Sequence, residues 1–137
     1  MRQFWPMLPP SFIWTWRRAP SMTKKRGILE MGTGNDLHGG NYTKAACRAV
    51  DDALHHSSLT MIRTLGVGAG DLYVDVTIGV QAPEKVDKAA VQAALPYGTV
   101  TVNVVKGGLD VPDEALGDVA VIASAALVVR LDLSDRG

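Results

Sequence analysis

The sequence has a single cysteine among its 137 residues, no long apolar run and no excess of either charge. One cysteine, Cys47, excludes an internal disulfide and suits a reducing cytoplasm. No apolar run approaches the ~20 residues that a bilayer-spanning helix needs, so we expect no membrane partner. Fourteen basic residues balance fourteen acidic ones, and this balance gives no overall field that favours nucleic acid. A chain of this length is expected to form one domain with a real hydrophobic core.

Acidic residues are missing from the first 22 residues, which differ from the rest of the chain. They hold all three tryptophans and four of the seven prolines, and they show neither helical nor strand periodicity. We therefore place a single α/β domain at residues 23–133, followed by a tail at 134–137. Residues 1–22 have two interpretations: a disordered, adhesive extension, or upstream sequence translated from a wrongly chosen start, with Met22 as the better start. We favour the second.

Familiar binding motifs are also missing. Gly32-Thr33-Gly34 follows a strand, but Leu37 stands where a dinucleotide fingerprint has its third glycine. A phosphate-binding loop would end in Gly-Lys-Ser or Gly-Lys-Thr, which the chain lacks here. Asp36 and His38 are metal-ligand types without metal-ligand spacing. We therefore predict no cofactor and no metal.

The apolar pattern that is present predicts a regular order of elements. Alternation predicts strands at 25–31, 72–80, 99–106 and 119–131. An apolar stripe of period 3.6 predicts a helix over 42–56 with Asn41 as its N-cap, and a second helix is expected at 83–95 with Asp87 as a cap. Residues 107–117 are expected to form a loop. The order β-α-β-α-β-β predicts an α+β two-layer sandwich, with a mixed four-stranded sheet and two helices on one face.

The richest segment chemically is MGTGNDLHGGNYTKAACRAVDDAL, residues 31–54, which we interpret as a glycine-rich loop leading into a helix. The glycines that would let backbone approach a ligand are Gly34, Gly39 and Gly40. Lys44 and Arg48 lie one helical turn apart, so their like charges repel each other. They also lie near the positive end of the helix dipole, which disfavours cations. Either the carboxylates of Asp36 and Asp52 neutralise the two cations, or the cations and the helix N–H groups bind an anion or a polarised carbonyl.

A family resemblance rests on four segments: GTGNDLHGGNYTKAACRAVDDALHHSSLTMIRTLG, VDVTIGV, LPYGTVTVNVVKGGL and VIASAALVVRL. They cover about residues 25–131 and resemble a family of small bacterial and archaeal conserved hypothetical proteins, named after a Listeria locus. The family has no established activity, so the resemblance implies no catalytic residues. The element order also resembles the chorismate-mutase-like trimer fold and the α/β units of cyanuric acid hydrolase and barbiturase. Those ring-opening amide hydrolases use Ser-Lys pairs, but this chain has no lysine in the strand at 72–80.

The outer face of the expected sheet bears on oligomeric state. It carries small polar residues mixed with apolar ones, among them Thr77, Thr101, Asn103 and Ser124. Such a face can be solvated or can pack against other copies of the chain. Together with the fold resemblance, this polar but uncharged set leads us to expect a homo-oligomer, and specifically a trimer.

The first of two functional hypotheses is a small enzyme, similar to an amide hydrolase, that acts on a compact polar carbonyl or carboxylate substrate. Lys44 and Arg48 would stabilise negative charge, and Asp36 or His38 would move protons. Ser124 is the candidate nucleophile in the fourth strand, and Ser58 is a second candidate beyond the first helix. The site would lie at a subunit interface.

The second hypothesis is a non-catalytic oligomeric protein in which the same groups bind a small polar or anionic metabolite. A strongly perturbed pKa at His38 or Lys44 inside a closed pocket would favour catalysis. An open, solvated loop would favour binding or a structural role. Whether the protein is an enzyme therefore stays open at this point.

Overall fold

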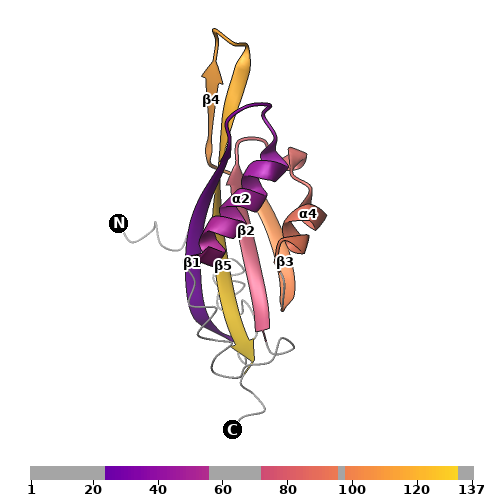
Figure 1. Ribbon diagram of the computed structural model, residues 1–137. Helices are drawn as coiled ribbons and strands as arrows, with labels where there is room; N and C mark the ends of the chain where they lie inside the picture. The colour runs from indigo at the N-terminus through magenta and orange to yellow at the C-terminus, as the bar shows by residue number, and fades with distance from the viewer. Residues whose placement is uncertain (1–23, 56–71, 96–97, 133–137) are drawn as a thin grey trace, which may run out of the picture.

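The computed structural model describes residues 24–55, 72–95 and 98–132. In chain order the elements are β1 (Lys24–Asp36), α2 (Tyr42–His55), β2 (Leu72–Val80), the short 3-10 helix η3 (Pro83–Lys85), α4 (Lys88–Ala93), β3 (Thr99–Lys106), β4 (Leu109–Asp113) and β5 (Asp118–Asp132). The strands form one sheet, and both α-helices lie on the same face of it (Figure 1). The α+β two-layer sandwich is therefore confirmed. None of the described helices is long and apolar enough to cross a membrane.

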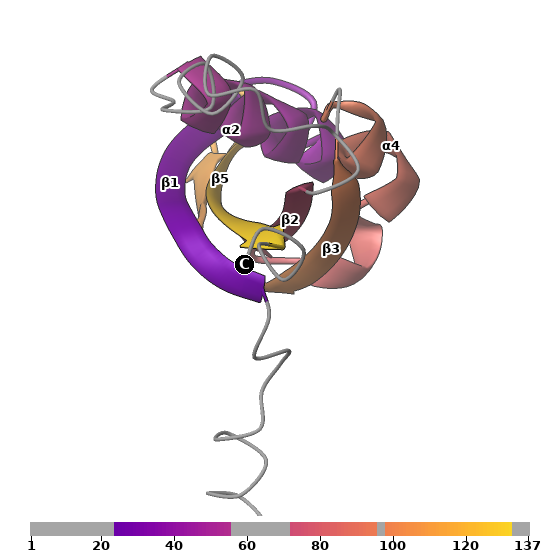
Figure 2. The ribbon, with the colours of Figure 1, turned by 90° about the horizontal axis from the view of Figure 1, so that it is seen from below.

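The sheet is mixed, with strand order β1-β5-β2-β3. β5 runs antiparallel to β1 on one side and to β2 on the other, while β2 and β3 are parallel. Seen along the strands, α2 and α4 cover one side of a curved sheet whose edge strands are β1 and β3 (Figure 2). The strands at 72–80 and 99–106 have the predicted bounds.

The expected number of four strands is wrong by one, because part of the segment expected as a loop forms β4. This strand pairs antiparallel with the first residues of β5, in the register Leu109↔Ile122 to Asp113↔Asp118. Its alternation is short and Pro112 interrupts it, which hides it in the sequence. Beyond the helical layer the two strands project as a hairpin (Figure 1). We call β4, the turn after it and residues 118–122 of β5 the arm.

β1 is longer than predicted, since it continues through Gly32 and Gly34 to Asp36. The glycines belong to a strand rather than to a loop, and they face α2. A Cβ atom on Gly34 would overlap backbone atoms of Ala45 and Ala49, and one on Gly32 would overlap Ala49 and Ala53. The strand therefore needs glycine because α2 packs directly on its backbone.

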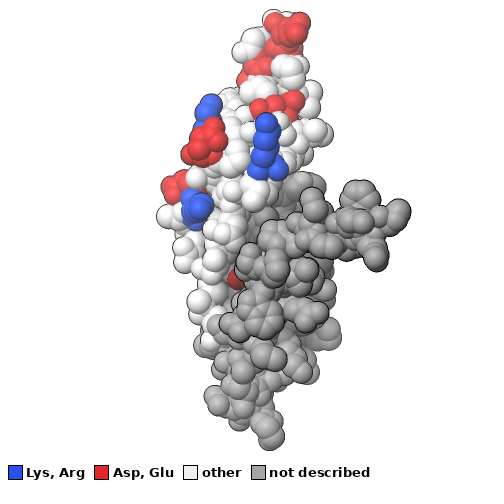
Figure 3. All heavy atoms as spheres, turned by 180° about the vertical axis from the view of Figure 1, so that it is seen from behind, with Lys and Arg blue, Asp and Glu red and all other residues white. Residues whose placement is uncertain are grey.

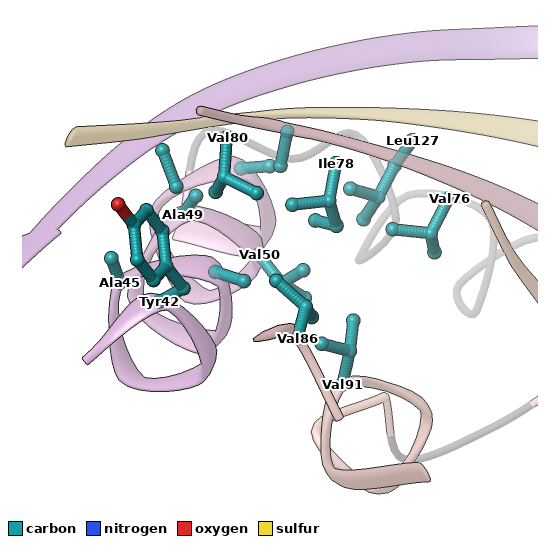
Figure 4. Close-up of a cluster of buried hydrophobic side chains, with 14 of the residues drawn as sticks. Tyr42, Ala45, Ala49, Val50, Val76, Ile78, Val80, Val86, Val91 and Leu127 are labelled. Carbon is teal, nitrogen blue, oxygen red and sulfur yellow. The ribbon is translucent and has the colours of Figure 1, made fainter. Parts of the chain in front are cut away.

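The core lies between α2, α4 and the sheet (Figure 4). α2 contributes small buried residues toward β1 and Val50 toward the sheet centre, where it meets Ile78 and Leu127. α4 contributes Val91. Both predicted caps are confirmed, since Asn41 Oδ1 accepts from Lys44 N at 3.0 Å, and Asp87 Oδ1 accepts from the backbone of α4. The second helix is shorter than the expected 83–95, because η3 and an extended Val86 precede it.

The other face of the sheet carries no described helix. Its exposed residues include the four polar residues expected there, Thr77, Thr101, Asn103 and Ser124. Met31, on edge strand β1, is 67% exposed beside them. One ion pair lies on the same face, between Arg130 Nε and Asp75 Oδ2 at 2.9 Å. This open face is therefore a mixed polar and apolar surface.

Candidate functional site

The predicted site residues surround the connection between β1 and α2. Gly39 and Gly40 have φ angles of +95° and +61°, so this short turn uses conformations that glycine adopts readily. Gly34 lies beneath α2 and is buried, so it offers no surface to a ligand. The accessible part of the predicted glycine-rich loop is therefore the turn after Asp36.

Asp36 is the centre of a charge cluster on the helical side of this turn. It is only 4% exposed and is, among the described residues, the one buried polar or charged residue. Its Oδ2 accepts a hydrogen bond from Asn41 N at 2.9 Å. Its Oδ1 lies 3.6 Å from Lys44 Nζ and 3.9 Å from Arg48 Nη1. The structure thus brings together three of the predicted residues, and one carboxylate faces two cations.

α2 also covers the outer edge of β1. Arg48 Nη1 donates to Asn35 O at 2.7 Å, and Thr33 N donates to Asp52 Oδ2 at 2.9 Å. Edge strands present unpaired backbone groups that other chains can join, and side chains that bind these groups protect the edge. Arg48 therefore has a structural contact as well as its place near Asp36.

His38 points to a different partner, Asp118 at the start of β5. His38 Nδ1 lies 3.3 Å from Asp118 Oδ2, and Gly39 N donates to Asp118 Oδ1 at 3.1 Å. Backbone N–H groups of Gly39 and Val119, and then His38, hold the pKa of the Asp118 carboxyl below its usual 3.8. Sequence reasoning missed Asp118, because 80 residues separate it from His38 and only the pairing of β1 with β5 brings them together.

A groove of about 620 Å³ lies beside this pair, between the turn and the arm. It is lined by Leu37, His38, Val111, Pro112, Asp113, Glu114, Asp118 and Ala120. Its walls are therefore apolar residues with carboxylates among them. No pattern in the sequence predicts this groove, since the arm was expected to be a loop.

Tyr42 makes a second contact that the sequence did not indicate. Its hydroxyl donates to Asp110 Oδ2 on β4, and Lys85 Nζ lies 5.8 Å from the centre of its ring. The hydrogen bond to Asp110 and burial raise the pKa of Tyr42 to about 12. The other oxygen of this carboxylate, Asp110 Oδ1, is buried without a hydrogen-bond partner. Tyr42 thus anchors the base of the arm to α2.

Ser124 lies apart from these groups. It pairs with Thr33 in β1 and is exposed on the open face, while its neighbours Ala123 and Ala125 are buried under the helices. The sheet therefore separates Ser124 from Lys44. Ser58, the second serine proposed as a nucleophile, lies outside the described residues.

The site is open rather than enclosed. The His38 side chain is 78% exposed, and those of Lys44 and Arg48 are 52% and 50% exposed. By the criterion derived from the sequence, an open arrangement favours binding or a structural role over catalysis. The buried part of the cluster is the carboxylate of Asp36.

Comparison with known proteins places the chain in a family. Residues 26–129 match the model of a family described as conserved hypothetical protein (Lin0512_fam). The chain belongs to this family. The Lin0512 match covers β1 through nearly all of β5, which includes the arm and every predicted site residue.

The fold is also similar to a solved structure. A crystal structure of an FtsZ-like protein of unknown function from Nostoc punctiforme is 35% identical, with a TM-score of 0.71. The match covers 82% of this chain and 99% of that chain. No curated protein matches the chain. Like the family, the solved structure carries no assigned activity, so function has to be argued from the site.

Proposed function

We propose that the protein is a non-catalytic binding protein for a compact anion, such as a carboxylate-bearing metabolite, held at the first turns of α2. The observation that supports this most is the exposure of the two cations in the cluster. Lys44 and Arg48 face the buried carboxylate of Asp36, and both cations are half exposed. An anion on the solvent side would meet the exposed N–H groups of both side chains.

The geometry leaves donors for such a ligand. Lys44 Nζ and Arg48 Nη1 lie 3.6 and 3.9 Å from Asp36 Oδ1, and these distances are long for a charge-assisted hydrogen bond. A lysine ammonium has three N–H donors and an arginine guanidinium has five. The helix dipole adds a favourable field for negative charge at this end of α2. Because both cations are half exposed, we expect weak, exchangeable binding.

A catalytic alternative is favoured by a separate observation, the hydrogen bond between His38 and Asp118. A carboxylate that orients a histidine can make it a general base, and His38 stands at the wall of the groove. In this alternative a water would attack a carbonyl substrate, and Lys44 would stabilise the negative charge that develops. Ser124 on the opposite face would have no direct part.

For the assembly we propose a homotrimer that packs through the open face of the sheet. Thr77 and Ser124 are exposed there beside Met31, so the face offers both hydrogen bonds and apolar contact. Most homo-oligomers have closed symmetry, and three copies form a closed ring when neighbouring parts of this face contact each other head to tail. A light-scattering mass equal to one chain at micromolar concentration would contradict the trimer.

We propose that the protein acts in the cytoplasm, because its single cysteine, Cys47, suits a reducing compartment. Burial, and then the carboxylate of Asp87, raise the pKa of the Cys47 thiol, and its Sγ lies 3.8 Å from Ala90 O. A half-buried thiol of this kind behaves as a small apolar side chain.

Calorimetric titration with sulfate and with malonate tests the proposed binding. We expect Lys44→Ala to weaken binding about tenfold or more and to leave the melting temperature nearly unchanged, since the Lys44 ammonium is half exposed and Arg48 and the backbone of Asn41 still face the Asp36 carboxylate. Lys88→Ala, at an exposed lysine of α4, is the matched control and should bind like the wild type. If the wild type does not bind either anion, or if both variants lose affinity equally, the proposal is wrong.

A further inference from the structure

The arm exposes apolar side chains that the rest of the fold leaves uncovered. Leu109, Val111 and Leu116 are 59%, 48% and 70% exposed, and Leu37 across the groove is 58% exposed. The arm extends beyond the layer formed by α2 and α4 (Figure 1). Exposed apolar residues gathered around a groove are typical of an interaction surface.

The same surface is strongly acidic. Between residues 107 and 129 the charged residues are Asp110, Asp113, Glu114 and Asp118, without any lysine or arginine. Figure 3 shows acidic side chains gathered toward the end of the arm. Asp113, Glu114 and Asp118 line the groove itself. An occupant should therefore combine positive charge with apolar side chains.

The chain contains one segment with this composition, residues 1–22. It has three arginines, Arg2, Arg17 and Arg18, and no acidic residue. It also holds all three tryptophans of the chain. Tryptophan and arginine are the residues that most often dominate binding energy at interfaces. The charge and apolar character of this segment thus complement those of the groove.

Chain length excludes binding of the arginine pair to the groove of its own copy. Arg18 lies six residues before Lys24, so these residues can span at most about 22 Å. β1 then runs from Lys24 to Asp36, which is about 40 Å of strand, and the groove begins only after it. Figure 1 shows the start of β1 at the end of the sheet opposite the arm.

We propose that the groove beside the arm binds residues 1–22 of a second copy, with Arg17 and Arg18 facing Asp113 and Glu114 and the tryptophans against Leu37 and Val111. Among the described residues the pairing of β5 with β1 stops at Val121 while β4 continues to Asp118, so the groove lies beside a part of β5 that only β4 pairs. This contact joins different surfaces on two copies, so it assembles copies head to tail. It gives residues 1–22 a role, in contrast to the interpretation favoured from sequence.

A fluorescein-labelled synthetic peptide of residues 1–22 tests the contact by fluorescence anisotropy. The full chain carrying Arg17→Ala and Arg18→Ala serves as receptor, because the segments of other receptor copies then compete less for the groove. We expect saturable binding that weakens as salt rises from 50 to 500 mM, since screening shortens the reach of the charges. Asp113→Asn with Glu114→Gln in the receptor should lower the affinity about fivefold or more.

Two controls make the result specific. Asp51→Asn, at an exposed carboxylate of α2 away from the groove, should leave peptide affinity unchanged. A peptide with Arg17→Glu and Arg18→Glu keeps the tryptophans and should bind at least tenfold more weakly. Absence of binding, or binding that ignores both the acid-to-amide changes and the arginine reversal, would overturn the proposal. Anion affinity at Lys44 is measured separately, so either proposal can fail alone.

Discussion

Two regions of the molecule cover a strand in opposite ways. One is the contact between α2 and β1, and the other is the arm. Under α2 the strand carries glycine at positions 32 and 34, and helix backbone lies directly on strand backbone. In the arm, β4 pairs with β5 and with no other described strand, and two side chains hold its base. Tyr42 binds Asp110, and Gln81 Nε2 donates to the carbonyl oxygens of Gly107 and Gly108 at 3.1 and 3.2 Å.

This difference teaches where sequence signals of function can mislead. Glycines next to chemically capable residues suggest a ligand loop, yet Gly32 and Gly34 serve packing. The residues available to a ligand are those that the tight contact leaves outside, namely the turn after Asp36 and the exposed cations of α2. The arm, which the sequence presents as an ordinary loop, supplies one wall of the groove.

The largest effect that distinguishes the two regions is expected from Gly34→Ala. The added methyl group would overlap the backbone of α2, which cannot move without displacing Ala45 and Ala49 from the core, so we expect a loss of about 3 kcal/mol of unfolding free energy. Gly117→Ala in the turn of the arm meets no atom within 4 Å and should cost about 1 kcal/mol, for its φ of +63° alone. Urea denaturation compares the two. Equal losses of unfolding free energy in the two variants would contradict the claim that the close packing of α2 on β1 requires glycine at position 34.

Removing the anchor of the arm should have an intermediate effect. Tyr42→Phe leaves Asp110 without its hydroxyl donor, and we expect a loss of about 1–3 kcal/mol with faster hydrogen exchange in β4. The pKa of Tyr42 is about 12 in the folded protein and 10 in the unfolded chain. The hydrogen bond to Asp110 therefore stabilises the folded state fully below pH 10, and this stabilisation is lost as pH rises toward 12. The variant should therefore lose less stability than the wild type across that range. An identical alkaline profile in Tyr42→Phe and wild type would contradict the anchor.

The smallest effect is expected at Asp118, where the turn meets the arm. The pKa of this carboxyl is lowered in the folded state, so it stabilises the protein above pH 3.8 and that contribution is lost as pH falls below this value. Asp118→Asn should therefore show a flatter decline of melting temperature on the acid side. Asp113→Asn changes a carboxylate elsewhere on the arm, and we expect its melting temperature to fall with pH as that of the wild type does. A decline in Asp118→Asn as steep as that of the wild type would count against the contact with His38 and Gly39.

Much of the fold could be predicted because local signals agree with it. Asn41 and Asp87 cap helices as their side chains suggest, and the alternation from Leu72 to Val80 defines a strand whose apolar face is buried. The end of β1 could not be predicted, since glycine has low strand propensity and its reason here is a helix on the other layer. Neither could Asp118 be matched to His38, because local patterns carry no information about a partner 80 residues away.

Only part of the site could be predicted, because local patterns group residues that are close along the chain. Asp36, Lys44 and Arg48 lie within one loop and one helical turn, so their proximity follows from short separation along the chain. Ser124 belongs to a different strand, and which face it occupies depends on register. A one-residue shift would have placed it on the face under α2 and its neighbour Ala123 on the open face.

The central claim is that the exposed cations of α2 bind a compact anion while the packed glycines and the arm do not. Amide chemical-shift mapping during a malonate titration measures this most directly. The account predicts saturable shifts at Tyr42 to Lys44 and at Arg48, absent in Lys44→Ala and kept in Asp36→Asn, which retains both cations. Shifts confined to the arm, at Val111 or Asp118, or no saturable shift at any amide of α2, would contradict it.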